Sequence, residues 1–373
     1  MVGGGQLARM TCQAAIPLGV RLQVLVEGRQ DSAAQVAGRV VTGSHRDLAD
    51  LRRFAEGCDA ITFDHEHVPG EHIRALERSG VTVRPGSSAL AHAQDKELMR
   101  TRLAEIGVPS PRWRAVTGVA DVERLAEESG WPVVLKTTRG GYDGRGVWTV
   151  EGPDDATRLV AASSAQGARL IAEERVEFER ELAVLVARSP HGQAAVYPVV
   201  ETVQVDGVCR EVYAPAPGLP ADRVAAAQQA ALRVAGGLGV TGVLAVEMFE
   251  TKDRIVVNEL AMRPHNSGHW TLDGARTSQF EQHLRAVLDL PLGAPTPLVP
   301  RTVMVNVLGG DQPDLHARYV HCMARDPELR IHVYGKAVRP GRKVGHVTVT
   351  GDDLDDLRAR ARYAAAYLRG GSS

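Results

Sequence analysis

The chain has 373 residues, with 44 lysine and arginine residues against 45 aspartate and glutamate residues, and a net charge of −1 at pH 7. This length suggests two or three domains, and the balanced charge predicts no nucleic-acid groove. Hydrophobic residues make up 44% and charged residues 24%, which excludes a mainly disordered chain. Glycine is in excess at 38 residues, and we expect the surplus at turns and close backbone approaches.

The sequence shows neither an apolar segment typical of a membrane helix nor the pattern of an export signal. No apolar run reaches the ~18 residues that a membrane helix needs, and Met1–Gly5 lacks a basic-then-apolar signal pattern. The four cysteines form no Cys-x-x-Cys pair, so neither a disulfide framework nor a zinc site is indicated. We expect a cytoplasmic protein with no membrane partner.

Strands and helices alternate in the first part of the chain, which is typical of a parallel α/β unit. The expected strands are 22–26 and 59–63, and the expected helices are 45–56 and 70–79. Only Met1 and Val2 precede the glycine turn at Gly3–Gly5, so the first strand is expected to be clipped.

The rest of the chain mixes helices with longer strands. Helices are expected at 96–106, 121–129, from an N-cap at Asp222 to Gly236, and at 353–369. Strands are expected at 132–137, 169–176, 181–188, 194–205, 208–214, 243–249 and 254–260. The proline-rich stretch 291–300 indicates a linker.

Gly3 to Ala8 satisfies Gly-x-Gly-x-x-Ala, and Glu27 follows at the end of the next strand, as in dinucleotide-binding folds. Such a turn can equally hold the phosphate of a mononucleotide at a helix N-terminus, or let a helix pack closely on a strand. These three interpretations stay open.

A second glycine-rich segment follows Lys136, with four glycines in the seven positions 140–146. The lysine precedes the glycines, whereas a P-loop places it after them. The pattern predicts a flap over the phosphates of ATP, and a glycine-rich hairpin with incidental charges is the alternative.

Glu247 and Glu259 fall on two strands joined by the turn Thr251–Asp253. Pairing Glu250 with Arg254 places Glu247 opposite Val257 and diagonal to Glu259, on one face of the sheet. The carboxylates can then converge on Mg²⁺ shared with nucleotide phosphates, although ion pairs with basic partners are the alternative.

The run from Arg263 to His269 supplies a permanent cation, two imidazoles and an amide, which suit a transferring phosphoryl group and a small oxyanion. The histidines could be zinc ligands or ordinary loop residues, but the carboxylates and the lack of cysteine favour magnesium. Four cations at 336–343 could clamp a phosphate around Pro340 or form a solvated face.

Together with Phe63–Pro69, Gln94–Lys96, Ser278–Glu281 and Arg339–His346, these motifs resemble the ATP-grasp superfamily. Within it they closely resemble the N5-carboxyaminoimidazole ribonucleotide synthetases of purine biosynthesis, over nearly the whole chain. Ala8, Asp64 and Val147 depart from the glycine, glutamate and glutamine that are more usual there.

The resemblance implies a mixed α/β and α+β fold. Its parts are a Rossmann-like parallel α/β domain at 1–94, an ATP-grasp domain at 95–295 with a lid at about 111–176, and a small β-rich domain at 296–373. It implies a carbon–nitrogen ligase that uses ATP, bicarbonate, 5-aminoimidazole ribonucleotide and Mg²⁺ or Mn²⁺, acts as a homodimer and binds no nucleic acid.

The resemblance also implies roles for individual residues. The ATP contacts would be Lys96, Lys136, Gly141, Tyr142, Asp143, Gly144, Arg145, Gly146, Val147, Glu173, Glu174, Arg175, Val176, Glu181, Gln204, Asn258 and Glu259. The ribonucleotide contacts would be Gly5, Gln6, Leu7, Glu66, Tyr142, Lys336, Arg339 and Arg342. Catalysis would depend on Asp143, Arg263, His265, Asn266 and Lys336, and Glu247 and Glu259 would bind the metal.

Three rival functions remain at this point. Another ATP-grasp enzyme, such as the formate-dependent glycinamide ribonucleotide transformylase, would share the ATP and metal residues but not the C-terminal segments. A nicotinamide-dependent oxidoreductase would leave the flap and the carboxylate pair unexplained. A non-catalytic nucleotide-binding regulator would release ADP only at background rates.

Overall fold

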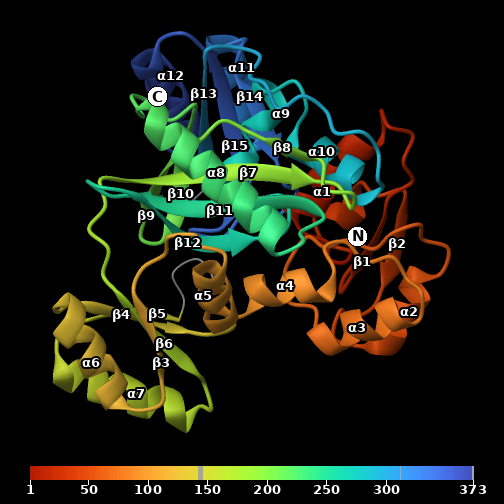
Figure 1. Cartoon of the computed structure of the whole chain (residues 1–373). Helices are drawn as coiled ribbons and strands as arrows, with labels where there is room; N and C mark the ends of the chain where they lie inside the picture. The colour runs from red at the N-terminus through yellow and green to blue at the C-terminus, as the bar shows by residue number, and fades with distance from the viewer. Residues whose placement is uncertain (142–145, 311, 372–373) are drawn as a thin grey trace.

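The computed structural model describes residues 1–141, 146–310 and 312–371, and within them the strands form three sheets (Figure 1). One is a short parallel pair near the N-terminus, one is a nine-stranded sheet through the middle of the molecule, and one is a four-stranded sheet that projects to one side. None of the helices in these residues is long and apolar enough to cross a membrane.

The N-terminal unit is a parallel α/β layer, as expected. Its two strands are β1 (Gln23–Val26) and β2 (Arg39–Thr42), which pair in parallel. Val2 forms parallel bridges to both Leu25 and Phe63, and Ile61 bridges to Val83, so single residues continue the layer beyond β1. The helices of this unit are α1 (Gln6–Ala15), α2 (Leu48–Ala55), α3 (Gly70–Arg78) and α4 (Ser87–Gln94).

The nine-stranded sheet runs in the order β12, β11, β7, β9, β10, β13, β15, β14, with β8 paired to β7. Its strands are β7 (Arg180–Arg188), β8 (Ala194–Val196), β9 (Val200–Val205), β10 (Val208–Ala214), β11 (Gly242–Glu250), β12 (Ile255–Ala261), β13 (Arg301–Leu308), β14 (Arg330–Val333) and β15 (Lys343–Gly351). Because β13 pairs with β10, the C-terminal strands extend the central sheet and do not form one of their own.

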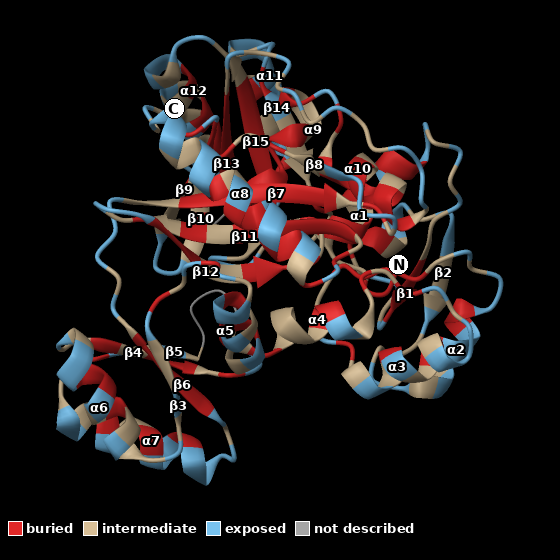
Figure 2. Ribbon diagram, in the orientation of Figure 1, coloured by how far each residue is buried: buried red, intermediate tan, exposed pale blue. Residues whose placement is uncertain are grey.

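Helices cover this sheet on both faces, and the buried residues lie between the layers (Figure 2). The helices of this region are α5 (Lys96–Glu105), α8 (Ala221–Gly237), α9 (Thr271–Gly274), α10 (Gln279–Val287), α11 (Tyr319–Arg325) and α12 (Leu354–Arg369). Val184 and Val246 of the sheet share one hydrophobic cluster with Leu25, Phe63 and Ile73 of the N-terminal unit. This shared core holds the N-terminal unit against the sheet.

The four-stranded sheet forms the lobe at the lower left of Figure 1. Its antiparallel order is β3, β6, β4, β5, and its elements are β3 (Trp113–Val116), β4 (Val133–Thr137), β5 (Val147–Val150), β6 (Leu170–Glu174), α6 (Val119–Ser129) and α7 (Pro153–Ala165). Leu125, Leu135 and Val160 belong to a separate hydrophobic cluster, so this lobe has a core of its own.

Several expectations about local structure are wrong. The strand expected at 194–205 is divided into β8 and β9, and the one expected at 59–63 is reduced to the single-residue bridges of Ile61 and Phe63. Glu247 pairs directly with Glu259 and not with Val257, because Glu250 pairs with Ile255 and not with Arg254, and a β-bulge between Glu247 and Met248 takes up one further residue of β12. The helix α8 has Pro220 as its N-cap, and Asp222 lies inside the first turn.

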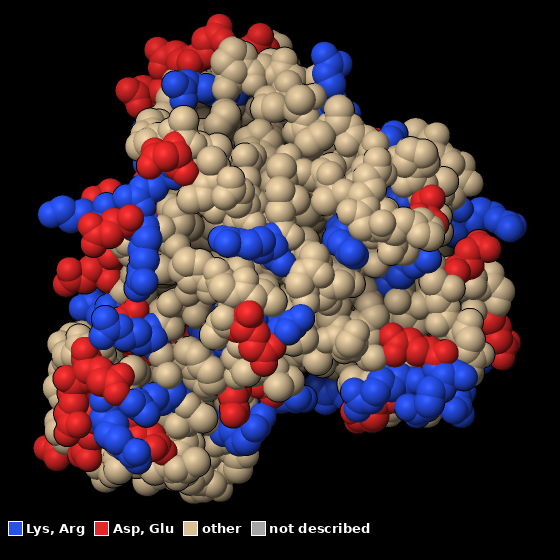
Figure 3. Space-filling view, viewed as in Figure 1, with Lys and Arg blue, Asp and Glu red and all other residues tan. Residues whose placement is uncertain are grey.

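On the face shown in Figure 3, basic and acidic side chains are interspersed. They do not collect into one continuous basic surface there, in keeping with 44 basic and 45 acidic residues in the sequence.

Candidate active site

A cleft of 1880 Å³ lies where the N-terminal unit, the nine-stranded sheet and the four-stranded sheet meet. The predicted site residues that line it are Gly5, Gln6, Leu7, Glu66, Lys96, Lys136, Gly141, Val147, Glu173, Glu174, Arg175, Val176, Glu181, Gln204, Glu247, Asn258, Glu259, Arg263, His265, Asn266, Lys336, Arg339 and Arg342. Gly146 lies outside this lining, and Tyr142, Asp143, Gly144 and Arg145 fall outside the described residues. The fold therefore brings together side chains that are far apart in the sequence, as in the contact of Lys336 with Gln6, which are 330 positions apart.

Lys96 enters the cleft from the first turn of α5. Asp95 caps this helix by accepting hydrogen bonds from the backbone N–H groups of Glu97 and Leu98, at 3.1 and 3.3 Å. The ammonium of Lys96 lies 2.5 Å from Glu259 Oε1 on β12. The Asp95 cap therefore fixes the start of α5, and with it Lys96, which pairs with the predicted metal ligand Glu259.

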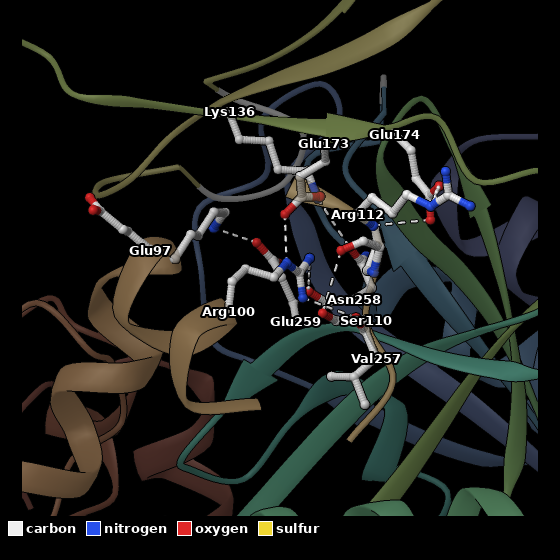
Figure 4. A network of polar contacts seen from close by, with 12 residues as sticks. Glu97, Arg100, Ser110, Arg112, Lys136, Glu173, Glu174, Val257, Asn258 and Glu259 are labelled. Carbon is white, nitrogen blue, oxygen red and sulfur yellow. Dashed lines mark hydrogen bonds and ion pairs between the residues drawn. The ribbon is translucent and has the colours of Figure 1, made fainter. Parts of the chain in front are cut away.

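Lys136 lies at the end of β4 and is held from two sides. Its Nζ is 2.7 Å from Glu173 Oε2 and donates to Asn258 Oδ1 at 3.1 Å (Figure 4). Burial raises the pKa of Glu173, but Arg100 and Lys136 outweigh burial and lower it to about 2. Glu173 is thus an ionised carboxylate on the adjacent strand β6, and both of its oxygens are engaged by cations.

The two carboxylates predicted to bind metal face each other across β11 and β12, since Glu247 and Glu259 are register partners. Burial, followed by repulsion from Glu259 and Glu181, raises the pKa of Glu247 to about 8. Glu259 has a lowered pKa, because the attraction of Lys96 and Lys136 outweighs its burial. Burial raises the pKa of Glu181, on the neighbouring strand β7, to about 7. Of these three carboxyl groups, Glu259 is therefore the one whose ionised form the neighbouring cations favour, whereas Glu247 and Glu181 resist ionisation.

The segment 263–268 places an imidazole beside Glu247. Burial, then Arg263 and Lys343, lower the pKa of His265 to about 3, so its ring is neutral. The Ser267 N–H donates to His265 Nδ1 at 3.4 Å, which leaves the ring proton on Nε2, 3.5 Å from Glu247 Oε1. Asn266 is held by an amide pair with Asn306 of β13, at 3.0 and 2.8 Å.

Glu66, predicted to face the ribonucleotide, holds the segment 262–263 in place. Its Oε1 accepts from the backbone N–H of Met262 at 2.9 Å, and its Oε2 accepts from Arg263 Nε at 3.1 Å. The carboxylate therefore orients Arg263 while it lines the cleft.

The N-terminal glycine turn closes around a buried carboxylate. Gly5 N–H donates to Asp64 Oδ2 at 2.5 Å, and a Cβ at Gly3 would lie 1.8 Å from Asp64 Oδ1. Burial raises the pKa of Asp64 to about 6, against the hydrogen bond from Gly5. Close packing against Asp64 therefore requires glycine at Gly3, which supports the close-packing interpretation of the glycine turn.

A second end of the cleft, where the C-terminal loop meets the N-terminal unit, is basic. Lys336 Nζ donates to Gln6 Oε1 of α1 and lies 5.8 Å from the centre of the Tyr334 ring. Arg339 and Arg342 line the same end from the loop that precedes β15. The C-terminal loop and the first helix therefore build this end together.

The sequence patterns missed several residues that shape the cleft. Arg100 is fully buried and holds Glu173, and Phe178 stacks on Phe249 with ring centres 4.6 Å apart in the cleft wall. Asp95 also binds Arg139 and Arg169, each at 2.8 Å. The Asp95 cap before Lys96 is the one local signal that could have pointed to Asp95. The contacts of Arg100, Phe178, Arg139 and Arg169 join segments that are distant in the chain, so no local pattern indicates them.

Fold and site together define an ATP-grasp ligase. Residues 101–280 match the ATP-grasp domain, residues 1–94 match the ribonucleotide synthetase preATP-grasp domain, and residues 302–360 match the phosphoribosylaminoimidazole carboxylase C-terminal domain. The N5-carboxyaminoimidazole ribonucleotide synthase of Mycobacterium tuberculosis is 57% identical over 375 residues, which covers 100% of this chain and 87% of that protein. The chain belongs to the N5-carboxyaminoimidazole ribonucleotide synthase family.

Solved structures agree with this membership. The N5-carboxyaminoimidazole ribonucleotide synthetase of Thermus thermophilus has a TM-score of 0.88 at 39% identity and covers 100% of this chain and 99% of its own. The Aspergillus clavatus enzyme, in complex with ADP and 5-aminoimidazole ribonucleotide, has a TM-score of 0.88 at 34% identity and covers 98% of each chain. The predicted fold class and ligase class are confirmed, and the oxidoreductase alternative is not supported.

Proposed function

We propose that this chain carboxylates 5-aminoimidazole ribonucleotide with bicarbonate, using ATP, and releases N5-carboxyaminoimidazole ribonucleotide, ADP and phosphate. The observation that carries the proposal is one cleft with two chemically different ends. Lys96, Lys136 and the Glu247–Glu259 pair form an end suited to a nucleoside triphosphate. Lys336 with its neighbouring arginines forms an end suited to the phosphate of a ribonucleotide.

The paired carboxylates fit Mg²⁺, with Mn²⁺ as an alternative. Oxygen ligands suit these hard cations, and a cation between Glu247 and Glu259 would offset the repulsion that helps raise the pKa of Glu247. Within the described residues no group of three or more His, Cys, Asp or Glu side chains forms a metal site, so phosphate oxygens and water would complete the coordination. When bound, the metal would neutralise charge on the transferred phosphoryl group.

In the first half-reaction, a bicarbonate oxygen attacks the γ-phosphorus of ATP, the bond to the β-phosphate oxygen breaks, and ADP leaves with that electron pair. Lys136 neutralises charge on the phosphoryl oxygens, and Arg263, oriented by Glu66, holds the bicarbonate. The neutral His265 and the anchored Asn266 contribute hydrogen bonds to the same anion.

In the second half-reaction, the carboxyphosphate loses phosphate and its carbon bonds to the exocyclic amine of the ribonucleotide. The amine proton passes to phosphate or to Asp143, which lies outside the described residues. Gln6, Lys336, Arg339 and Arg342 would position the ribonucleotide for this step. The predicted flap from Gly141 to Val147 would cover the ATP end and exclude water.

The test is ADP formation with Mg²⁺, bicarbonate and freshly prepared aminoimidazole ribonucleotide. We expect turnover only with all substrates present. Equal turnover without the ribonucleotide, or a requirement for formate in place of bicarbonate, would contradict the assignment. NAD(P)H fluorescence should show no binding.

We also propose a cytoplasmic homodimer, which the family resemblance supports. Light scattering on the purified protein tests the dimer, and subcellular fractionation tests the location.

A further inference from the structure

Arg100 contacts the nucleotide end of the cleft without reaching its surface. It projects from α5 and is fully buried, at 0% exposure. Its Nε donates to Glu173 Oε1 at 2.7 Å, its Nη1 to the carbonyl of Val257 at 3.0 Å, and its Nη2 to the carbonyl of Asn258 at 2.8 Å. One side chain thus joins a helix, the lid strand β6 and the core strand β12 (Figure 4).

These contacts close a ring of hydrogen bonds. Glu173 Oε2 lies 2.7 Å from Lys136 Nζ, Lys136 donates to Asn258 Oδ1 at 3.1 Å, and Asn258 accepts from Arg100 through its carbonyl. The ring holds two cations and one carboxylate, so one positive charge is left over. Of the two cations, only Lys136 lines the cleft.

We propose that Arg100 is a positioning residue that neutralises Glu173 and so leaves the charge of Lys136 available to the phosphates of ATP. This inference rests on the proposed use of ATP. Without Arg100, Glu173 would have Lys136 as its sole charged partner in the ring, and the pair would present no net charge. In a buried setting such a loss of charge strongly weakens the binding of an anion.

The arginine fork is essential to this arrangement. Its planar donors reach the carboxylate and two carbonyl oxygens at once, whereas the compact ammonium of lysine cannot span three acceptors on two strands. Arg100→Lys should therefore keep the charge but loosen Lys136, with an effect between those of the unsubstituted protein and Arg100→Met.

The experiment measures the Kd for ATP with Mg²⁺ by calorimetry, without bicarbonate or ribonucleotide. We expect Arg100→Met to raise Kd about tenfold or more. The double variant Arg100→Met with Glu173→Gln removes the competing carboxylate, so its Kd should return to within about threefold of the unsubstituted protein. The control is Arg102→Met on the same helix, which removes a pair with Glu105 and a hydrogen bond to the carbonyl of Gly237, neither of them in the cleft lining, and should leave Kd unchanged.

Equal weakening in Arg100→Met and in the double variant would overturn the inference, because a purely structural role would not be rescued by a second charge removal. An unchanged Kd in Arg100→Met would also overturn it. If that variant does not fold by circular dichroism, Arg100→Lys decides: its Kd for ATP should rise by about threefold or more, and an unchanged Kd would refute the positioning role. Failure of the unsubstituted protein to bind ATP would instead overturn the proposed function itself.

Discussion

Replacing Gly309 with alanine should move the loop that we assign to the ribonucleotide phosphate. Gly309 follows β13, its N–H donates to the carbonyl of Arg342 at 2.7 Å, and its carbonyl accepts from Gly341 at 3.0 Å. A Cβ at this position would lie 2.1 Å from the carbonyl oxygen of Arg339. Ordinary contact between such atoms is about 3.5 Å, so the loop must retreat by roughly 1.4 Å.

This displacement should act on one substrate. We expect the KM for aminoimidazole ribonucleotide to rise about 10- to 100-fold, because Arg339 and Arg342 move with the loop. The KM for ATP should stay within about twofold, since Lys136 and Glu259 lie on other strands. The strain should also lower the free energy of unfolding by about 1 to 3 kcal/mol.

The assay is steady-state ADP release with each substrate varied in turn. Gly236→Ala is the matched control, because a Cβ there meets nothing within 4 Å and the residue lies in helix α8. A ribonucleotide KM that stays within about twofold in Gly309→Ala would refute the assignment of this loop, provided that the control also behaves as the unsubstituted protein does.

Three further predictions concern the metal, the buried carboxylate and the core. Glu259→Gln should lower kcat by about 100-fold or more and shift the Mg²⁺ titration to higher concentration, because it removes a proposed metal ligand; normal kcat and an unshifted titration would contradict that role. Glu173 has a pKa lowered from 4.5 to about 2, so its ionised form stabilises the fold by about 3 kcal/mol above pH 4.5, and this contribution is lost as pH falls toward 2. The stability difference between the unsubstituted protein and Glu173→Gln, from urea unfolding, should therefore shrink from pH 6 to pH 3, and a constant difference would count against the pairing. Phe280→Ala should cost about 3 to 5 kcal/mol in urea unfolding, because Phe280 is 0% exposed and packs with Leu7 between α1 and α10; a loss below about 1 kcal/mol would contradict this packing.

Several local features could be predicted from the sequence because each depends on residues close together in the chain. The hairpin between β9 and β10 turns at Asp206 and Gly207, and both have positive φ, 54° and 72°, which Asp-Gly pairs favour. The helix α12 begins after Asp353, whose carboxylate accepts from two backbone N–H groups. Long apolar stretches also marked strands, as in β7, expected at 181–188 and observed at Arg180–Arg188, and β11, expected at 243–249 and observed at Gly242–Glu250.

Other features could not be predicted because they arise from distant contacts or from small irregularities. Glu247 lies directly opposite Glu259 because the hairpin pairs Glu250 with Ile255 and because a bulge follows, and neither feature has a local signature in the sequence. The helix start at Pro220 was missed because an aspartate in the first turn resembles a cap when only sequence is considered. Phe178 and Phe249 meet across 71 positions, from 178 to 249, which no spacing rule anticipates.

The sequence by itself determined the fold class, the family and the residue types that line the cleft, because motifs with specific spacing and apolar periodicity are local properties. Only the tertiary structure decided which charges compensate one another. Arg100 and Glu173 are 73 positions apart, and Lys136 and Asn258 are 122 apart, yet they close one buried ring. Burial makes such pairings energetically decisive, since an ion pair contributes little in water but much in a desolvated interior, and burial is a property of the packed molecule.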